Sequence, residues 1–132
     1  MKFPAANISI KNWNPKEDYL VYIILNEFIY NDNQKLYQDY YHNMDFVDSN
    51  GDIYKLIEKR PPSSLWRNVF KFLPNTYKIE LRFRKTPDNM DIEEIREFVL
   101  KQISRLPKEE YIEEWKNEIR NANTISSILG EV

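Results

Sequence analysis

Cysteine is absent from this chain of 132 residues. That absence excludes disulfide bonds, thiolate metal sites and a cysteine nucleophile. It suits a reducing compartment, so we expect a cytoplasmic protein. Long apolar runs are missing too, because the longest, Tyr19 to Leu25, is far too short to span a membrane. The first segment, MKFPAANISI, lacks the apolar centre of a signal peptide, and we expect no membrane association.

Glycine and histidine are scarce. Gly51 and Gly130 are the only two glycines, which leaves no room for a glycine-rich phosphate loop. His42 is the only histidine, so a site built on several histidines is excluded and a Ser-His-Asp triad would have to use it. No serine lies in a nucleophile-elbow context. We expect His42 to pair structurally with Glu58, and we expect no enzymatic activity, cofactor or metal.

Charge is unevenly spread along what we expect to be one domain, residues 1–132. Residues 1–54 carry a net charge of −4, residues 55–86 of +7 and residues 87–132 of −5. Acidic helices that flank and neutralise a basic sheet explain this distribution most simply. The alternative is a basic face that binds an acidic partner.

Adjacent glutamates occur at 93–94, 109–110 and 113–114. Glycosidases need two carboxylates on opposite sides of a cleft, one of them in an apolar pocket. These pairs fall instead on amphipathic helical patterns, where adjacent glutamates form the solvated face. We therefore interpret them as surface charge.

The segment from Met44 to Lys59 predicts a β-hairpin, within 42–59, around Asn50-Gly51. A two-residue loop would mix polar and apolar partners across the ladder. A three-residue loop, Ser49-Asn50-Gly51, places Gly51 in a left-handed conformation. It gives an apolar face and an ion pair on the other face, with these partners: Met44 and Leu56, Phe46 and Tyr54, Asp45 and Lys55.

The same loop resembles part of a calcium-binding loop. With Gly51 at the sixth position of an EF-hand, however, the first and last ligand positions hold Phe46 and Ile57, which cannot bind calcium. We predict a turn, and do not assign a cation to the cluster of Asp45, Asp48 and Asp52.

Tyr77 to Lys85 has the strongest strand pattern. Apolar residues alternate with charged ones, which indicates an antiparallel sheet that is open on one side and includes the hairpin. A shorter alternation at Ile8 and Ile10 indicates an N-terminal edge strand. Such an edge can pair with its copy, so a homo-oligomer is one of the options.

About four helices complete a predicted α+β fold. Asn14 and Pro15 begin one that runs to about Tyr30, although residues 19–25 also fit a strand. Residues 34–43 fit a short helix or a strand. Helical spacing and capping residues predict further helices over 63–73, 91–106, 108–122 and 124–129.

Two groups of residues are candidates for partner binding. Arg82 and Arg84 lie on the wet side of the predicted strand, where they can meet carboxylates. RNA-binding sheets need exposed aromatics beside such residues, whereas here the aromatics fall on the opposite side. Tyr37, Tyr40 and Tyr41 suit an interface, because tyrosine is enriched in binding hot spots, and they suit core packing equally.

These observations favour a non-enzymatic domain that binds a protein partner of unidentified kind. Small acidic α+β domains without cysteine include inhibitors and immunity-type proteins that neutralise a partner. This comparison rests on the general class of domain and not on a sequence motif. The alternative is a nucleic-acid-binding domain that uses the basic segment 55–86. We expect a protein partner rather than nucleic acid.

Overall fold

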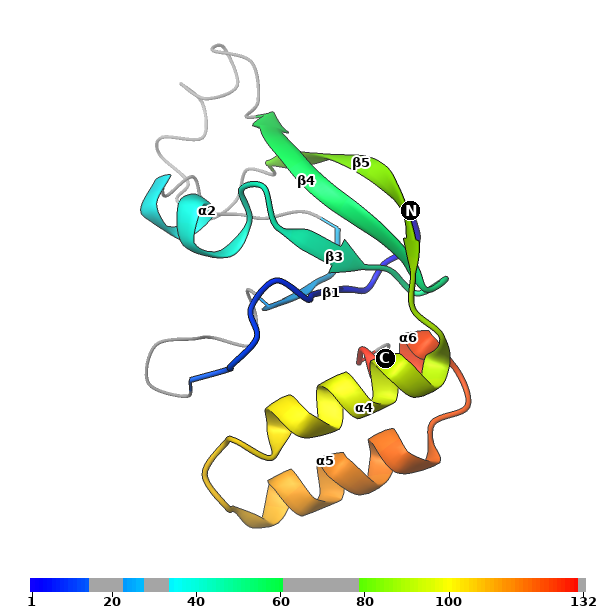
Figure 1. The fold of residues 1–132 in the computed structure, drawn as a ribbon. Helices are drawn as coiled ribbons and strands as arrows, with labels where there is room; N and C mark the ends of the chain where they lie inside the picture. The colour runs from blue at the N-terminus through cyan, green and yellow to red at the C-terminus, as the bar shows by residue number, and fades with distance from the viewer. Residues whose placement is uncertain (15–22, 28–33, 61–78, 131–132) are drawn as a thin grey trace.

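The computed structural model describes residues 1–14, 23–27, 34–60 and 79–130. Five strands form one antiparallel sheet in the order β2-β1-β3-β4-β5. They are β1 (Ala5–Asn7), β2 (Ile24–Leu25), β3 (Asp45–Val47), β4 (Asp52–Arg60) and β5 (Glu80–Asn89). The described helices are α2 (Gln34–Tyr40), α4 (Ile92–Ile103), α5 (Glu110–Asn121) and α6 (Ile125–Ile128). The predicted α+β fold with a small antiparallel sheet is confirmed (Figure 1).

The sheet separates two hydrophobic cores. Neighbouring residues on a strand point to opposite faces, and Phe46 and Val47 on β3 accordingly belong to different cores. Val47 packs with residues from α4, α5 and α6, whereas Phe46 packs with tyrosines of the α2 segment. Full burial of a side chain such as Phe46 stabilises the fold by roughly 1.5–3 kcal/mol. The sheet is therefore not open on one side at its centre, contrary to the expectation from the sequence.

The hairpin register is the predicted one. Asp45 pairs with Lys55 and Phe46 with Tyr54. The amide of Gly51 donates to the Asp48 carbonyl oxygen over 3.0 Å, and Gly51 has φ of +85°, so the three-residue loop closes as expected. Val47 pairs with Ile53 on the face that we expected to be polar, and both are buried beneath the C-terminal helices.

The N-terminal strand is not an edge strand. Residues 5–7 lie between β2 and β3, and Ala5 and Ala6 are fully buried in opposite cores. Their small side chains suit a position where both faces are covered. The edge strand predicted at Ile8 and Ile10 is therefore wrong, because both residues follow β1, and β1 itself already has two neighbours.

One further prediction needs correction, one open alternative is decided, and others fall outside the described residues. Ile24 and Leu25 form β2, so the helix expected to continue through them is wrong there, and the competing strand interpretation holds. Residues 34–43 begin with a helix, α2. Most of the expected helix before Ile23, its last residues 28–30 and the whole of the expected helix 63–73 lie outside the described residues.

Helices α4 and α6 begin where the sequence predicts, and α5 begins at Glu110, two residues after its predicted start. The Asp91 carboxylate accepts the Glu94 amide hydrogen bond over 2.8 Å, and the Glu94 carboxylate accepts from the Asp91 amide, which forms a capping box for α4. Thr124 caps α6 through the Ser127 amide. Gly130 follows α6 with φ of +92°.

Candidate functional site

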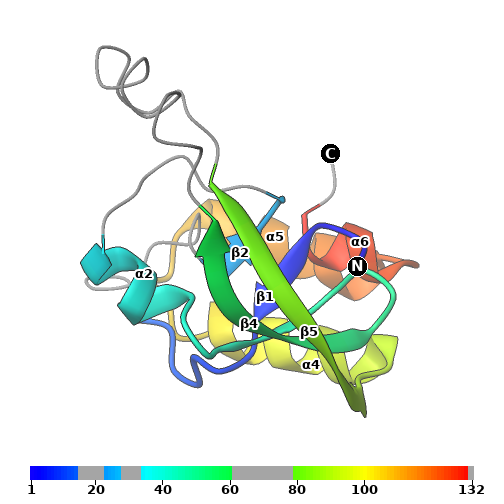
Figure 2. The same ribbon diagram turned by 90° about the horizontal axis from the view of Figure 1, so that it is seen from above.

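The last strand of the sheet, β5, carries the predicted arginines. Within the described residues β5 pairs only with β4, and Figure 2 shows the two strands side by side. Glu80, Arg82 and Arg84 are exposed on one side of the strand. Leu81 and Phe83 point to the other side, where they pack against the core that contains Phe46. The predicted division of this strand into a wet and a buried side is confirmed.

The strand also extends beyond its expected end. It continues through Pro87 to Asn89, whereas the sequence suggested an end at Lys85. Proline has no amide hydrogen to give to a ladder, but it is tolerated on the outermost strand. The register with β4 is irregular there, because Tyr54 pairs with Lys85 but Asp52 pairs with Asn89.

Most cations on β4 and β5 lie beside a carboxylate. Four contacts join them: Arg82 with Glu58 (3.0 Å), Arg60 with Glu58 (3.4 Å), Lys55 with Asp45 (3.3 Å) and Lys85 with Asp52 (3.7 Å). Hydrogen bonds from Arg82, and then from Arg60, lower the pKa of Glu58 from its ordinary value. These pairs are exposed, so each contributes little to stability, but they neutralise most of the local charge.

Arg84 differs from these four cations. Among the described residues, its guanidinium has no carboxylate partner, and the residue directly opposite on β4 is another cation, Lys55. Like charges at opposite positions of a ladder are unfavourable. Glu80, four residues earlier on the same side, lies opposite Arg60 on β4, but Arg60 pairs with Glu58, and no ion pair joins Glu80 to a cation in the described part of the chain. Glu80 was not among the predicted site residues, although the alternation that selects Arg82 and Arg84 places it on the same side.

A groove lies on the other side of β5. Its volume is about 480 Å³, and it is lined by Met1, Phe3, Glu27, Tyr54, Glu80, Leu81 and Phe83. The ring of Phe3 meets that of Phe83 edge to face, with centroids 6.3 Å apart. The groove is thus lined mainly by apolar and aromatic residues. Nothing in the sequence pattern brings the first residues of the chain to this strand, so their contribution was missed.

The three candidate tyrosines lie in the core. Tyr37, Tyr40 and Tyr41 are 5%, 8% and 1% exposed, respectively. Tyr41 stacks between Tyr37 and Phe46, with ring centroids 6.4 Å away on either side. Of the two roles that the sequence left open for these tyrosines, core packing is the one that fits their burial.

Tyr37 also has polar neighbours. Its hydroxyl lies 3.4 Å from His42 Nδ1, and the Lys59 ammonium lies 5.0 Å from its ring centroid. Burial, and then the negative charge of Glu58, raise the pKa of Tyr37 above its ordinary value, which keeps the phenol protonated. His42 contacts Tyr37 and Asn43, so the expected pairing with Glu58 does not form among the described residues.

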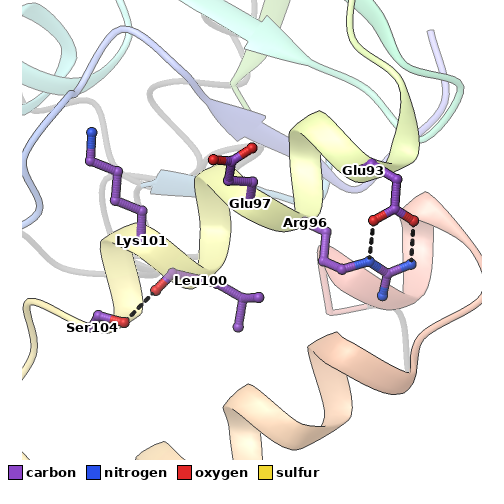
Figure 3. A pocket seen from close by; sticks show the side chains of 6 residues that line it. All are labelled: Glu93, Arg96, Glu97, Leu100, Lys101 and Ser104. Carbon is purple, nitrogen blue, oxygen red and sulfur yellow. Dashed lines mark hydrogen bonds and ion pairs between the residues drawn. The ribbon is translucent and has the colours of Figure 1, made fainter.

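A second groove, of about 420 Å³, follows the outer side of α4 (Figure 3). Its most prominent group, Arg96, is already engaged. The guanidinium pairs with both oxygens of Glu93 and donates to the carbonyl oxygens of Ile119 and Arg120 at the end of α5. Arg96 thereby joins α4 to α5, which is a structural role.

The aspartates of the hairpin do not converge on a cation position. Asp48 is fully buried, and its Oδ1 accepts hydrogen bonds from the amides of Asn50 and Asp52, at 2.9 and 3.0 Å. Its Oδ2 accepts from the amide of Lys2 over 2.9 Å. Across the described ranges, no three potential metal-binding side chains come together.

Comparisons of the chain with models of protein families, with curated proteins and with solved structures find no match. Within the part of the chain that the structure describes, no helix is long and apolar enough to cross a membrane.

Proposed function

We propose that this chain is a non-enzymatic protein-binding domain that holds its partner along β5. Arg84 carries this proposal. It is an exposed cation on the outermost described strand, and it lacks the carboxylate that Lys55 and Arg82, its neighbours on the same side of the sheet, each have. A carboxylate from a partner would complete the pattern, since arginine binds carboxylates through two parallel hydrogen bonds.

The strand itself supplies the second element of the proposed site. An unpaired strand edge can bind an extended peptide through backbone hydrogen bonds, and side chains on either side of the strand then select the sequence. Here Arg84 lies on one side, and the apolar groove around Leu81 and Phe83 lies on the other. The proposed ligand is therefore an extended segment with an acidic residue and an apolar residue at neighbouring positions.

A pull-down from native lysate with matched variants tests the proposal. Arg84→Glu reverses the charge and places a carboxylate opposite Lys55, so it leaves the fold intact. Arg105→Glu makes the same change on an exposed residue after α4. We expect wild type and Arg105→Glu to retain the same stoichiometric partner, and Arg84→Glu to lose it. Recovery of no partner, or equal recovery by all three, would contradict the proposal.

Nucleic-acid binding through residues 55–86 is the alternative function. Such binding weakens steeply as salt rises, because each contact with a phosphate releases counterions. In the described part of this segment, Lys55, Arg60, Arg82 and Lys85 lie beside carboxylates, which compete with phosphate. A mobility-shift assay at low salt separates the two functions. Inhibition of the partner, as in immunity-type proteins, stays a prediction from the sequence.

A further inference from the structure

We propose that a second copy of this chain binds the outer edge of β5, in an antiparallel register that pairs Glu80 of each copy with Arg84 of the other. This inference rests on the proposed function, because both require that the edge of β5 binds protein. It names the missing carboxylate as Glu80 of the second copy.

Backbone geometry determines which residues of β5 face outward. The amide of Leu56 donates to the Met44 carbonyl oxygen over 3.0 Å, and its carbonyl accepts from the Asn43 amide over 2.9 Å. Leu56 therefore turns both backbone groups toward β3. Its partner on β5 is Phe83, so Leu56 and Phe83 form a pair without mutual hydrogen bonds. The N–H and C=O of Phe83 consequently point away from β4.

The same alternation applies along the strand. The backbone N–H and C=O groups of Leu81 and Phe83 point away from β4. Those of Glu80, Arg82 and Arg84 point toward β4. Within the described residues, no further strand pairs with this edge. The edge is thus a template for another strand.

When two copies of β5 pair, residues whose backbone groups point outward must lie opposite each other, because only these groups can form hydrogen bonds between the copies. This requirement leaves few symmetric registers. A register centred on Arg82 pairs Leu81 with Phe83 of the second copy, and Phe83 with Leu81 of the second copy. It also places Glu80 opposite Arg84 of the second copy in a pair without mutual hydrogen bonds, where side chains approach most closely. Both ion pairs are opposite-charge pairs, which are favourable across a ladder.

Neighbouring registers are less favourable. A register centred on Phe83 places Arg82 opposite Arg84 of the second copy, which repeats like charges on both sides of the axis. A register centred on Leu81 offers Glu80 to Arg82, which already pairs with Glu58, and does not bring Glu80 opposite Arg84. Only the register centred on Arg82 satisfies both unpartnered charges.

The two sides of the joined sheet are also consistent with this register. Arg82 lies at the axis opposite its copy, and in each chain its charge is balanced by Glu58 at 3.0 Å. On the other side, Leu81 and Phe83 of the two copies form a continuous apolar strip beside the two grooves. Half-buried apolar side chains therefore gain cover at the same place where charges are matched.

Complementary charge reversals test the register. Glu80→Arg and Arg84→Glu each produce like charges across the interface, so either chain alone should dissociate about tenfold more readily than wild type. An equimolar mixture of the two variants restores both ion pairs, and should regain dimers that contain one chain of each kind. Analytical ultracentrifugation with one chain labelled measures both effects, and circular dichroism confirms that each variant is folded.

The lack of native cysteine permits a second test by cross-linking. Arg82→Cys brings two thiols to opposite positions at the axis, within the Cα separation that a disulfide allows. Arg84→Cys places the thiols several residues apart along the paired strands, beyond that limit. We expect a disulfide-linked dimer from Arg82→Cys and none from Arg84→Cys.

The outcomes are decisive for each proposal separately. A wild-type chain that is monomeric at every concentration measured, variants that dimerise as well as wild type, or a disulfide through position 84 would overturn the self-pairing. If the pull-down still recovers a partner that depends on Arg84, the proposed function stands without the dimer. A dimer with no other partner would confirm the self-pairing and contradict the proposed binding of another protein.

Discussion

The amide of Met90 donates a hydrogen bond to the Gly51 carbonyl oxygen over 2.8 Å, which connects the hairpin loop to the segment between β5 and α4. The approach is so close that a Cβ on Gly51 would lie 2.4 Å from the Met90 carbonyl oxygen. Gly51 also has φ of +85°, a conformation that other residues adopt at a cost. Two independent constraints therefore select glycine here.

Gly51→Ala should lower the free energy of unfolding by about 2–4 kcal/mol, because it combines backbone strain with a clash against a backbone oxygen. Gly130→Ala is the matched control. Gly130 has φ of +92°, and in the described part of the chain no atom lies within 4 Å of the added methyl group, so only the conformational cost applies, about 1–2 kcal/mol. Urea denaturation measures both, and equal losses would show that the Met90 contact is unimportant.

Asp48→Asn should destabilise the protein by about 2–3 kcal/mol, because an amide nitrogen would face a backbone donor in a buried place. The carboxylate now accepts hydrogen bonds from both the hairpin loop and the N-terminal segment. Asp88→Asn, on an exposed residue of β5, should change stability by no more than about 0.5 kcal/mol. Thermal unfolding compares the two, and a stable Asp48→Asn protein would refute this role.

Glu58 provides a prediction about pH. Its pKa is lowered in the folded protein, chiefly by the hydrogen bond from Arg82, so its contribution to stability is present above the ordinary glutamate pKa. That contribution is lost as pH falls through the lowered pKa. Arg82→Gln should therefore move the Glu58 titration midpoint upward, toward the ordinary value, as measured by NMR of the side-chain carboxyl carbon.

The control for this titration is Arg105→Gln, on an exposed residue after α4. It should leave the Glu58 midpoint unchanged. If Arg82→Gln also left it unchanged, Arg82 would not be the cause of the lowered pKa.

The hairpin and the C-terminal helices could be predicted because their signals are local. Asn50-Gly51 determines a turn, and charge pairing between Asp45 and Lys55 selects the register. Asp91 and Thr124 have side chains that cap the next turn of chain directly. In each case the residues that determine the structure lie within a few positions of one another.

The remaining errors arose where distant segments decide the outcome. Ala5 and Ala6 have weak strand patterns, yet they form a central strand because both sheet faces are covered there. The tyrosines of residues 37–41 have the same helical spacing whether they face a core or a partner, and only the packing against Phe46 distinguishes the two. Phe3 reaches Phe83 through the fold, which no local pattern indicates.

For the same reason, the sequence predicts which residues of β5 are exposed but not which of them have ion-pair partners. Alternation along β5 identifies Arg82 and Arg84 as exposed. It cannot show that Glu58 neutralises Arg82 while Arg84 lies opposite Lys55, because that depends on the bulge and register between β4 and β5. The difference between the two arginines is what directs the proposal to Arg84.

Amide hydrogen exchange along β5, measured at increasing protein concentration, tests most directly whether its outer edge binds protein. The amides of Arg82 and Arg84 point toward β4 and should exchange slowly throughout. Those of Leu81 and Phe83 point outward, so they should exchange rapidly in dilute protein and become protected as a second copy binds. Exchange at Leu81 and Phe83 that stays fast at every concentration, and stays fast when a captured partner is added, would contradict the account.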